Sequence, residues 1–203
     1  MFADRGGRNI EQPKSTNAGG STILSGQTAT EGFAGPVLHT ERLKLVPIRP
    51  CDYEPYRAFI MSDRARYIGG PFEDEGKAWR TLASMIGHWH MRGFGLFSVI
   101  TRADDRLVGF IGNWWPLDFP EREIGWTLLA CGEGKGIAFE VAREVQRHSF
   151  HSLGWPTAVS YIHPENTRSI SLAKRLGELH DTNAAGPQGC DLVYRHMPPG
   201  LAP

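Results

Sequence analysis

The sequence has few of the features that mark disulfide-rich, metal-binding or membrane proteins. Its three cysteines are Cys51, Cys131 and Cys190, and their wide spacing suggests neither a disulfide framework nor a Cys-x-x-Cys metal site. We therefore expect a reducing, cytoplasmic setting and no bound metal. No apolar run approaches the length of a membrane span, and the N-terminus lacks the apolar segment of a signal peptide.

The sequence also has no excess of charge of either sign. Its 22 lysines and arginines balance 22 aspartates and glutamates. Net charge therefore gives no argument for nucleic acid or an anionic membrane as a partner, and we expect neither. A chain of 203 residues, of which 40% are hydrophobic, is long enough for one domain with a sizeable core.

Three segments differ in composition. Residues 1–36 are rich in Gly, Ser, Thr, Asn and Gln and hold few large apolar residues. Such a stretch cannot bury enough surface to offset its ordering entropy, so we expect a tail that is disordered or that orders only against a partner. Residues 37–197 form the predicted domain, and residues 198–203 form a short C-terminal tail.

The predicted domain alternates strand-like and helix-like patterns. Period-two runs predict strands at 39–48, 95–101, 106–115, 123–129, 157–162 and 192–196, with a further short one near Leu179. Period-3.6 spacing predicts helices at 52–61, 74–92, 136–152 and 166–176. This order predicts an α+β fold with a mixed, mostly antiparallel central sheet flanked by helices.

The segment Glu123-Ile-Gly-Trp-Thr-Leu-Leu-Ala-Cys-Gly-Glu-Gly-Lys-Gly-Ile-Ala-Phe-Glu140 is the most informative one. It predicts a strand, a glycine-rich turn and the first turn of a helix. A helix start offers unpaired N–H groups and the positive end of a dipole, and glycines let a phosphate approach them. The segment therefore predicts an anion site for a phosphorylated cofactor. It matches neither the P-loop pattern nor the dinucleotide fingerprint.

Two motifs in this order resemble the GNAT superfamily of N-acetyltransferases, specifically its ribosomal-protein N-terminal (RimJ/RimL-type) branch. Glu133-Gly-Lys-Gly136-Ile-Ala138 is similar to the family's pyrophosphate motif Gln/Arg-x-x-Gly-x-Gly/Ala, with Glu133 in place of Gln or Arg. Downstream, Asn166-Thr-Arg-Ser169 and the following Lys-Arg175-Leu-Gly177 resemble the family's Asn-x-x-Ser…Lys-Leu-Gly pattern. The resemblance covers roughly residues 37–196 and implies the three-layer α/β/α acyl-CoA N-acyltransferase fold.

The resemblance implies acetyl-CoA as the acetyl donor and a set of residues that bind it. The pyrophosphate would be held by the main chain of Gly134, Lys135, Gly136, Ile137 and Ala138. The pantetheine arm would pair with Thr127, Leu128 and Leu129 as an added strand. Asn166, Ser169 and Arg175 would also contact the cofactor, although Asn166 is equally a favoured helix N-cap and Arg175 an ordinary solvated charge. A carboxylate at Glu133 would repel the pyrophosphate.

Catalytic candidates are fewer. Glu123 is the leading candidate for the general base, with a solvated strand-edge carboxylate as the alternative interpretation, and His163 is a second candidate. The acceptor pocket is expected among Tyr67, Phe72, Trp114 and Trp115, where core packing is the alternative for the two tryptophans. The region after the second motif lacks the tyrosine that many family members carry there.

The implied function is direct transfer of acetyl from acetyl-CoA to a primary amine, either a protein N-terminus or a small-molecule amine. Making a lysine amine neutral at pH 7 costs roughly 4.6 kcal/mol, whereas an α-amine costs about 1–1.4 kcal/mol, so a protein N-terminus requires only a modest base. A non-catalytic acyl-CoA-binding module and a structural interaction domain are the alternatives. The sequence allows a homodimer but does not establish one.

Overall fold

The computed structural model describes residues 35–187 and 191–198. The two predicted tails, at 1–36 and 198–203, lie outside this range except for their innermost residues. The described part holds one eight-stranded sheet in the order β1-β2-β3-β4-β5-β6-β8-β7. The strands are β1 (Leu38–His39), β2 (Leu43–Pro47), β3 (Leu96–Thr101), β4 (Leu107–Trp114), β5 (Glu123–Leu128), β6 (Ala158–Ile162), β7 (Leu179–His180) and β8 (Leu192–His196).

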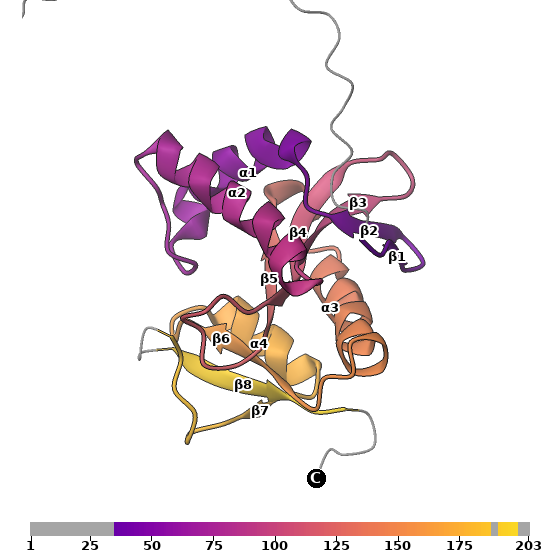
Figure 1. Ribbon diagram of the computed structural model, residues 1–203, viewed down its shortest axis with the longest axis vertical. Helices are drawn as coiled ribbons and strands as arrows, with labels where there is room; N and C mark the ends of the chain where they lie inside the picture. The colour runs from indigo at the N-terminus through magenta and orange to yellow at the C-terminus, as the bar shows by residue number, and fades with distance from the viewer. Residues whose placement is uncertain (1–34, 188–190, 199–203) are drawn as a thin grey trace, which may run out of the picture. The chain divides into compact units, whose positions relative to one another are not determined.

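Four α-helices accompany the sheet: α1 (Tyr53–Ile60), α2 (Glu75–Arg92), α3 (Ile137–Arg147) and α4 (Thr167–Arg175). Figure 1 shows α1 and α2 side by side in the upper part of the view and α4 with β6, β8 and β7 in the lower part. Every neighbouring strand pair is antiparallel except β5 and β6. The predicted α+β fold with a mixed, mostly antiparallel sheet is confirmed.

Local differences from the prediction have simple causes. The first predicted strand is two strands, because the chain turns at Thr40, whose N–H donates to the carbonyl of Leu43. The predicted helix at 136–152 ends as an α-helix at Arg147 and continues as a π-helical turn, His148–Ser152. The helix α2 begins and ends as expected: the Asp74 side chain accepts the N–H of Gly76, and Gly93 ends the helix at φ 75°.

The core has two parts. The larger part packs α1, α2 and α3 against the sheet and includes the fully buried Trp89, Phe97 and Ile111. The smaller part joins α4 to β6 and β8 through Ile162, Ala173 and Tyr194, with the partly buried Trp126 of β5 packed against them. Because Trp126 belongs to β5, it links the two parts.

The sheet changes character between β5 and β6. These two parallel strands share one ladder position, Glu123 opposite Val159. The next carbonyl of β5, that of Ile124, accepts a hydrogen bond from the Ser160 hydroxyl at 2.7 Å instead of from the main chain of β6. Within the described residues no further ladder position joins the strands, so β5 has an unpaired edge over 125–128.

A buried polar network holds the end of β5 that is still paired. The Nε2 atom of His196 on β8 is 2.8 Å from the Ser160 hydroxyl oxygen. Its Nδ1 atom is 2.8 Å from the Nε2 atom of Gln146 on α3. Glu178 lies 3.2 Å from His196 Nδ1, and both side chains are buried. Burial raises the pKa of Glu178 to about 8 and lowers that of His196 to about 3, so the pair is neutral at pH 7.

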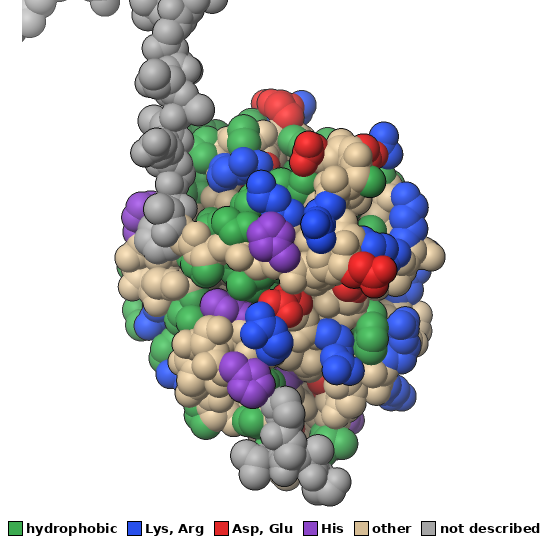
Figure 2. Space-filling model, turned by 90° about the vertical axis from the view of Figure 1, so that its right-hand side faces the viewer, with side chains coloured by type: hydrophobic (Ala, Val, Ile, Leu, Met, Phe, Trp, Pro, Cys, Tyr) green, Lys and Arg blue, Asp and Glu red, His purple; other side chains and the backbone are tan. Residues whose placement is uncertain are grey.

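Charges on the surface are mixed in sign. On the face displayed in Figure 2, lysine and arginine side chains are interspersed with aspartates and glutamates. No described helix is long and apolar enough to cross a bilayer.

Candidate active site

The glycine-rich loop after β5 leads into the first turn of α3. After a short 3-10 turn at Ala130–Gly132, Gly134 and Gly136 take positive φ values of 71° and 74°. These left-handed conformations favour glycine. Gly136 is the N-cap of α3 and provides no side-chain hydrogen bond, so the first N–H groups of the helix have no side-chain acceptor there.

The predicted pyrophosphate-binding residues lie together in this loop. Gly134, Lys135 and Gly136 are exposed, and a Cβ added at Gly134 would meet no atom within 4 Å. Ile137 is buried in the core, and Ala138 packs partly against it, so these two could contact a ligand only through the main chain. Main-chain recognition of a pyrophosphate by this loop stays a prediction.

Glu133, the residue that departs from the motif, is not an isolated negative charge. Its carboxylate forms an ion pair with Arg64 of the 3-10 turn Asp63–Ala65, and a second one, at 3.0 Å, with Arg168 in the first turn of α4. Neither arginine belongs to the predicted site. The repulsion expected from Glu133 is thus offset by two cations that come from distant parts of the chain.

Arg42 supports the loop from its other side. Its guanidinium donates to the carbonyl of Lys135 at 3.1 Å and forms an ion pair with Glu140 of α3. A groove of about 730 Å³ opens there between the loop and the β3–β4 turn, and its lining includes Arg42, Arg102, Arg106 and Lys135. Arg42 therefore fixes the position of the loop relative to β2.

The unpaired edge of β5 presents main-chain groups toward β6. The N–H of Leu129 donates to Val108 of β4, and hydrogen-bonding sides alternate along an antiparallel strand. Thr127 therefore also faces β4, whereas Trp126 and Leu128 direct their N–H and C=O groups away from it. Of the three residues predicted to pair with pantetheine, Leu128 faces the open side, and Thr127 and Leu129 face β4.

Glu123 lies at the paired end of this edge. Its side chain is half-buried, and the main-chain N–H of Tyr161 on β6 donates a hydrogen bond to it. Burial raises the pKa of the Glu123 carboxyl to about 8, and the nearby negative charge of Asp191 adds to the rise. A carboxyl with this pKa gains or loses a proton near neutral pH, as a general base must.

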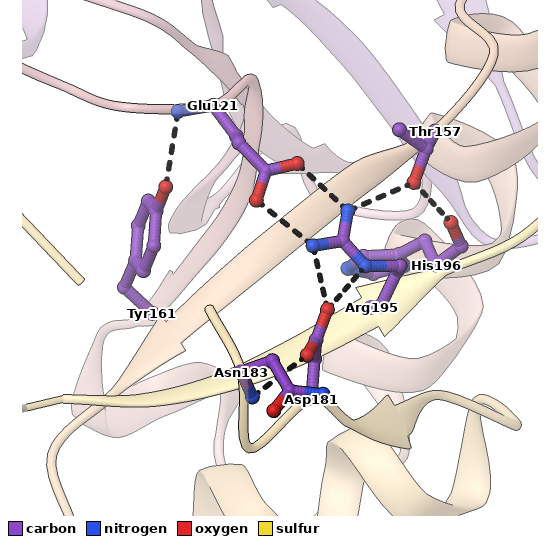
Figure 3. Close-up of polar contacts among 7 residues, drawn as sticks. All are labelled: Glu121, Thr157, Tyr161, Asp181, Asn183, Arg195 and His196. Carbon is purple, nitrogen blue, oxygen red and sulfur yellow. Dashed lines mark hydrogen bonds and ion pairs between the residues drawn. The ribbon is translucent and has the colours of Figure 1, made fainter. Parts of the chain in front are cut away.

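Glu121, only two residues earlier, has a different environment. Arg195 of β8 binds its carboxylate with two hydrogen bonds of 2.7 and 2.9 Å and also pairs with Asp181. Figure 3 shows these groups converging around Arg195. The main-chain N–H of Glu121 donates a hydrogen bond to the hydroxyl oxygen of Tyr161 at 3.1 Å. Glu121 is therefore held as a structural ion pair, which distinguishes it from Glu123.

His163 and Tyr67 lie against one another. His163 follows the last residue of β6, and its ring centroid is 5.1 Å from that of Tyr67. Arg66 lies over the Tyr67 ring, with its guanidinium carbon 4.7 Å from the ring centroid. The structure therefore brings one predicted catalytic candidate together with one predicted pocket residue.

The other predicted pocket residues have packing partners of their own. Phe72 is buried in the core and stacks under Lys77. Trp114 ends β4 opposite Glu123 and stacks on His88, while Trp115 packs beneath Arg92. Trp114 and Trp115 thus lie at the Glu123 end of β5, and packing accounts for all three aromatic rings.

The second motif has structural partners as well. The Asn166 side-chain carbonyl caps α4 by accepting the Ser169 N–H at 3.2 Å, which leaves its Nδ2 group free to donate among the described residues. The Ser169 hydroxyl accepts the indole N–H of Trp126 at 3.1 Å. Arg175 lies over the ring of Phe139 on α3, 4.8 Å from its centroid.

No group of three or more potential metal ligands occurs in the part of the chain that the structure describes. His88, which alternates with His90 on α2, is a buried structural residue. Its Nδ1 donates to the carbonyl of Phe94 at 2.8 Å, and its Nε2 accepts the N–H of Trp115 at 3.0 Å.

Comparison with known proteins decides the family. A family model described as an acetyltransferase (GNAT) domain matches residues 42–178. The chain belongs to the GNAT acetyltransferase family. It is 32% identical over 143 residues to an uncharacterized N-acetyltransferase, p20, of Bacillus licheniformis, which covers 68% of this chain and 80% of the relative.

Solved structures of GNAT proteins share the fold. An acetyltransferase from Agrobacterium tumefaciens has a TM-score of 0.77 and 36% identity, with 82% of this chain and 96% of that chain covered. A spermidine N-acetyltransferase from Vibrio cholerae, solved in complex with CoA and spermine, has a TM-score of 0.62 and 16% identity, with 77% and 94% covered. At that identity the second likeness shows the GNAT fold alone.

Proposed function

We propose that this GNAT domain transfers acetyl from acetyl-CoA directly to a primary amine, with the cofactor laid along the unpaired edge of β5. The supporting observation is the position of that edge, which runs from Glu123 at one end to the glycine-rich loop at the other. Pantetheine amides can pair with Trp126 and Leu128 as a strand would. The pyrophosphate then reaches the free N–H groups that begin α3.

In this arrangement each step has a group to perform it. Glu123 accepts the proton of the incoming ammonium, and the neutral nitrogen attacks the thioester carbon. An N–H on the unpaired edge donates to the oxygen that becomes negative. The C–N bond forms and the C–S bond breaks. The nitrogen then loses its second proton, which passes through water to the coenzyme A thiolate, an acceptable leaving group because its thiol pKa is near 8.5.

The acceptor is proposed as an amine that approaches from the side of Glu123. Asp191 places a negative charge near Glu123, and a nearby negative charge attracts a cationic amine. A protein N-terminus and a small amine both have this chemistry. The resemblance of the two motifs to the ribosomal-protein branch supports the first, and the spermine complex of a structural neighbour supports the second.

The proposal has a two-stage test. Thermal unfolding is measured with and without excess acetyl-CoA, because a ligand at 100 times its Kd stabilises a protein by roughly 2.7 kcal/mol. An amine panel that includes peptides with free N-termini, lysine and polyamines is then assayed for thiol release. Binding with turnover supports the transferase, binding without turnover on any amine favours an acyl-CoA-binding module, and no binding at millimolar acetyl-CoA refutes both.

A further inference from the structure

The carboxylate of Glu133 and the guanidinium groups of Arg64 and Arg168 form a charged cluster at the entrance of the glycine-rich loop. Arg64 comes from the segment between α1 and α2, and Arg168 from the first turn of α4. Glu133 directly precedes Gly134, so both guanidinium groups lie one residue from the predicted anion site. We call these three residues the Glu133 cluster.

The charges of this cluster are poorly suited to a purely structural role. Arg168 lies in the first turn of α4, near the positive end of the helix dipole, where a cation is disfavoured. Its side chain is 84% exposed, and exposed ion pairs contribute little to stability. Two cations pair with one carboxylate, so the cluster has a net charge of plus one, and Lys135 adds a further positive charge to the adjoining loop.

A pyrophosphate group complements that charge. Arginine guanidinium groups bind phosphate oxygens with paired, charge-assisted hydrogen bonds, which are stronger than their exposed contacts to a single carboxylate. The motif that this loop resembles has Gln or Arg, which carry side-chain N–H donors, where this chain has Glu133, whose carboxylate can only accept. The two arginines are positioned to supply that donor function from outside the motif.

We infer that Arg64 and Arg168 are side-chain ligands of the coenzyme A pyrophosphate and that Glu133 holds them in place until the pyrophosphate replaces it. This inference rests on the proposed binding of acetyl-CoA to the loop. The inference also gives the Glu133 carboxylate a role. It orients the two guanidinium groups in the free protein, and their contacts with it are replaced by contacts with the pyrophosphate when the ligand binds.

The test is isothermal titration of the full chain with CoA, dephospho-CoA and pantetheine. Arg64→Ala and Arg168→Ala are expected to weaken CoA binding about 10- to 100-fold each. The same loss is expected for dephospho-CoA, which keeps the pyrophosphate, and no loss for pantetheine, which lacks it. Arg147→Ala is the matched control, because Arg147 pairs with Glu144 further along α3 and is expected to leave CoA binding unchanged.

Glu133→Gln tests the exchange itself. Removing the competing carboxylate is expected to tighten CoA binding about 3- to 10-fold and to lose this gain when Arg64 or Arg168 is also replaced by alanine. Wild-type affinity in both arginine variants overturns the inference but leaves the proposed function intact. If the arginine variants lose affinity for CoA but not for dephospho-CoA, the inference is also overturned, because the arginines would then contact the 3′-phosphate. No binding of CoA by the wild-type chain overturns the proposed function and this inference together.

Discussion

The two ends of β5 carry glutamates in opposite electrostatic environments. Glu123, at the paired end, has no ion-pair partner among the described residues and lies near the negative Asp191, and burial raises its pKa to about 8. Glu133, at the loop end, is paired with two arginines. The first group can exchange a proton near neutral pH, and the second forms ion pairs with two cations.

In the proposed mechanism this difference separates chemistry from binding along one strand. Side chains fix the paired end. The Ser160 hydroxyl donates a hydrogen bond to the carbonyl of Ile124, and His196 Nε2 lies within hydrogen-bond distance of the same hydroxyl. The loop end offers main-chain N–H groups and cations. Substitutions at the paired end should therefore change the rate of transfer, and substitutions at the loop end should change the affinity for acetyl-CoA.

The largest expected effect is at the paired end. Glu123→Gln should lower kcat by about 10²- to 10⁴-fold, because the amide cannot accept the proton of the amine. Glutamine keeps an oxygen for the N–H of Tyr161, so the Kd for acetyl-CoA should stay within about twofold. Steady-state rates and titration calorimetry measure the two quantities.

Glu121→Gln is the control for that variant. It weakens the ion pair with Arg195 and should lower the melting temperature while kcat is kept. Wild-type turnover by Glu123→Gln would remove Glu123 from the mechanism.

At the loop end, Gly136→Asp should weaken acetyl-CoA binding by about 100-fold or more. The substitution forces an L residue to a φ of 74° and places a carboxylate where the pyrophosphate would bind. Gly154→Asp is the matched control, because Gly154 has a similar φ of 64° and open surroundings but lies outside the loop. Equal losses of affinity in the two variants would show that backbone strain, and not position, is responsible.

The raised pKa of Glu123 predicts a pH dependence of intermediate size. A base works only when ionised, and a carboxyl with a pKa of about 8 is about one-tenth ionised at pH 7 and about nine-tenths ionised at pH 9. The single-turnover rate should therefore rise nearly tenfold over this range, with a midpoint near pH 8. The rise should be absent in Glu123→Gln; if it persists there, it comes from the amine.

The smallest effect concerns Asn166, which caps α4. Asn166→Ala removes the cap and should lower stability by about 1 kcal/mol, or a few degrees in Tm. Asn166→Asp keeps an oxygen for the Ser169 N–H and should keep most of the stability, but it removes the Nδ2 donor. If that donor contacts the cofactor, the aspartate variant should show a raised KM for acetyl-CoA at nearly wild-type Tm.

The parts of the site that sequence reasoning located are those encoded by adjacent residues. Gly134 and Gly136 are needed where the backbone adopts positive φ, and Asn166 has the residue type that a helix N-cap requires. The order of helices and strands could be predicted too, because periodicity is also a pattern among residues that are close in sequence. Glu123 was predicted as the general base from its place in the resemblance, and its raised pKa depends on burial by neighbouring elements.

The parts that sequence reasoning missed depend on contacts between distant segments. Arg64 reaches Glu133 across 69 positions, and Ser160 reaches the carbonyl of Ile124 across 36. No local pattern signals either contact. The exposed position of a basic residue, Arg168, in the first turn of a helix was the one available signal, because cations are disfavoured there.

Amide hydrogen exchange along β5, measured by NMR with and without acetyl-CoA, tests the central claim most directly. The N–H groups of Trp126 and Leu128 face away from β4, so they should exchange rapidly in the free protein and become protected at saturating acetyl-CoA. The N–H of Thr127 faces β4 and should be protected in both states. Unchanged exchange at Trp126 and Leu128 in the presence of millimolar acetyl-CoA would contradict the account.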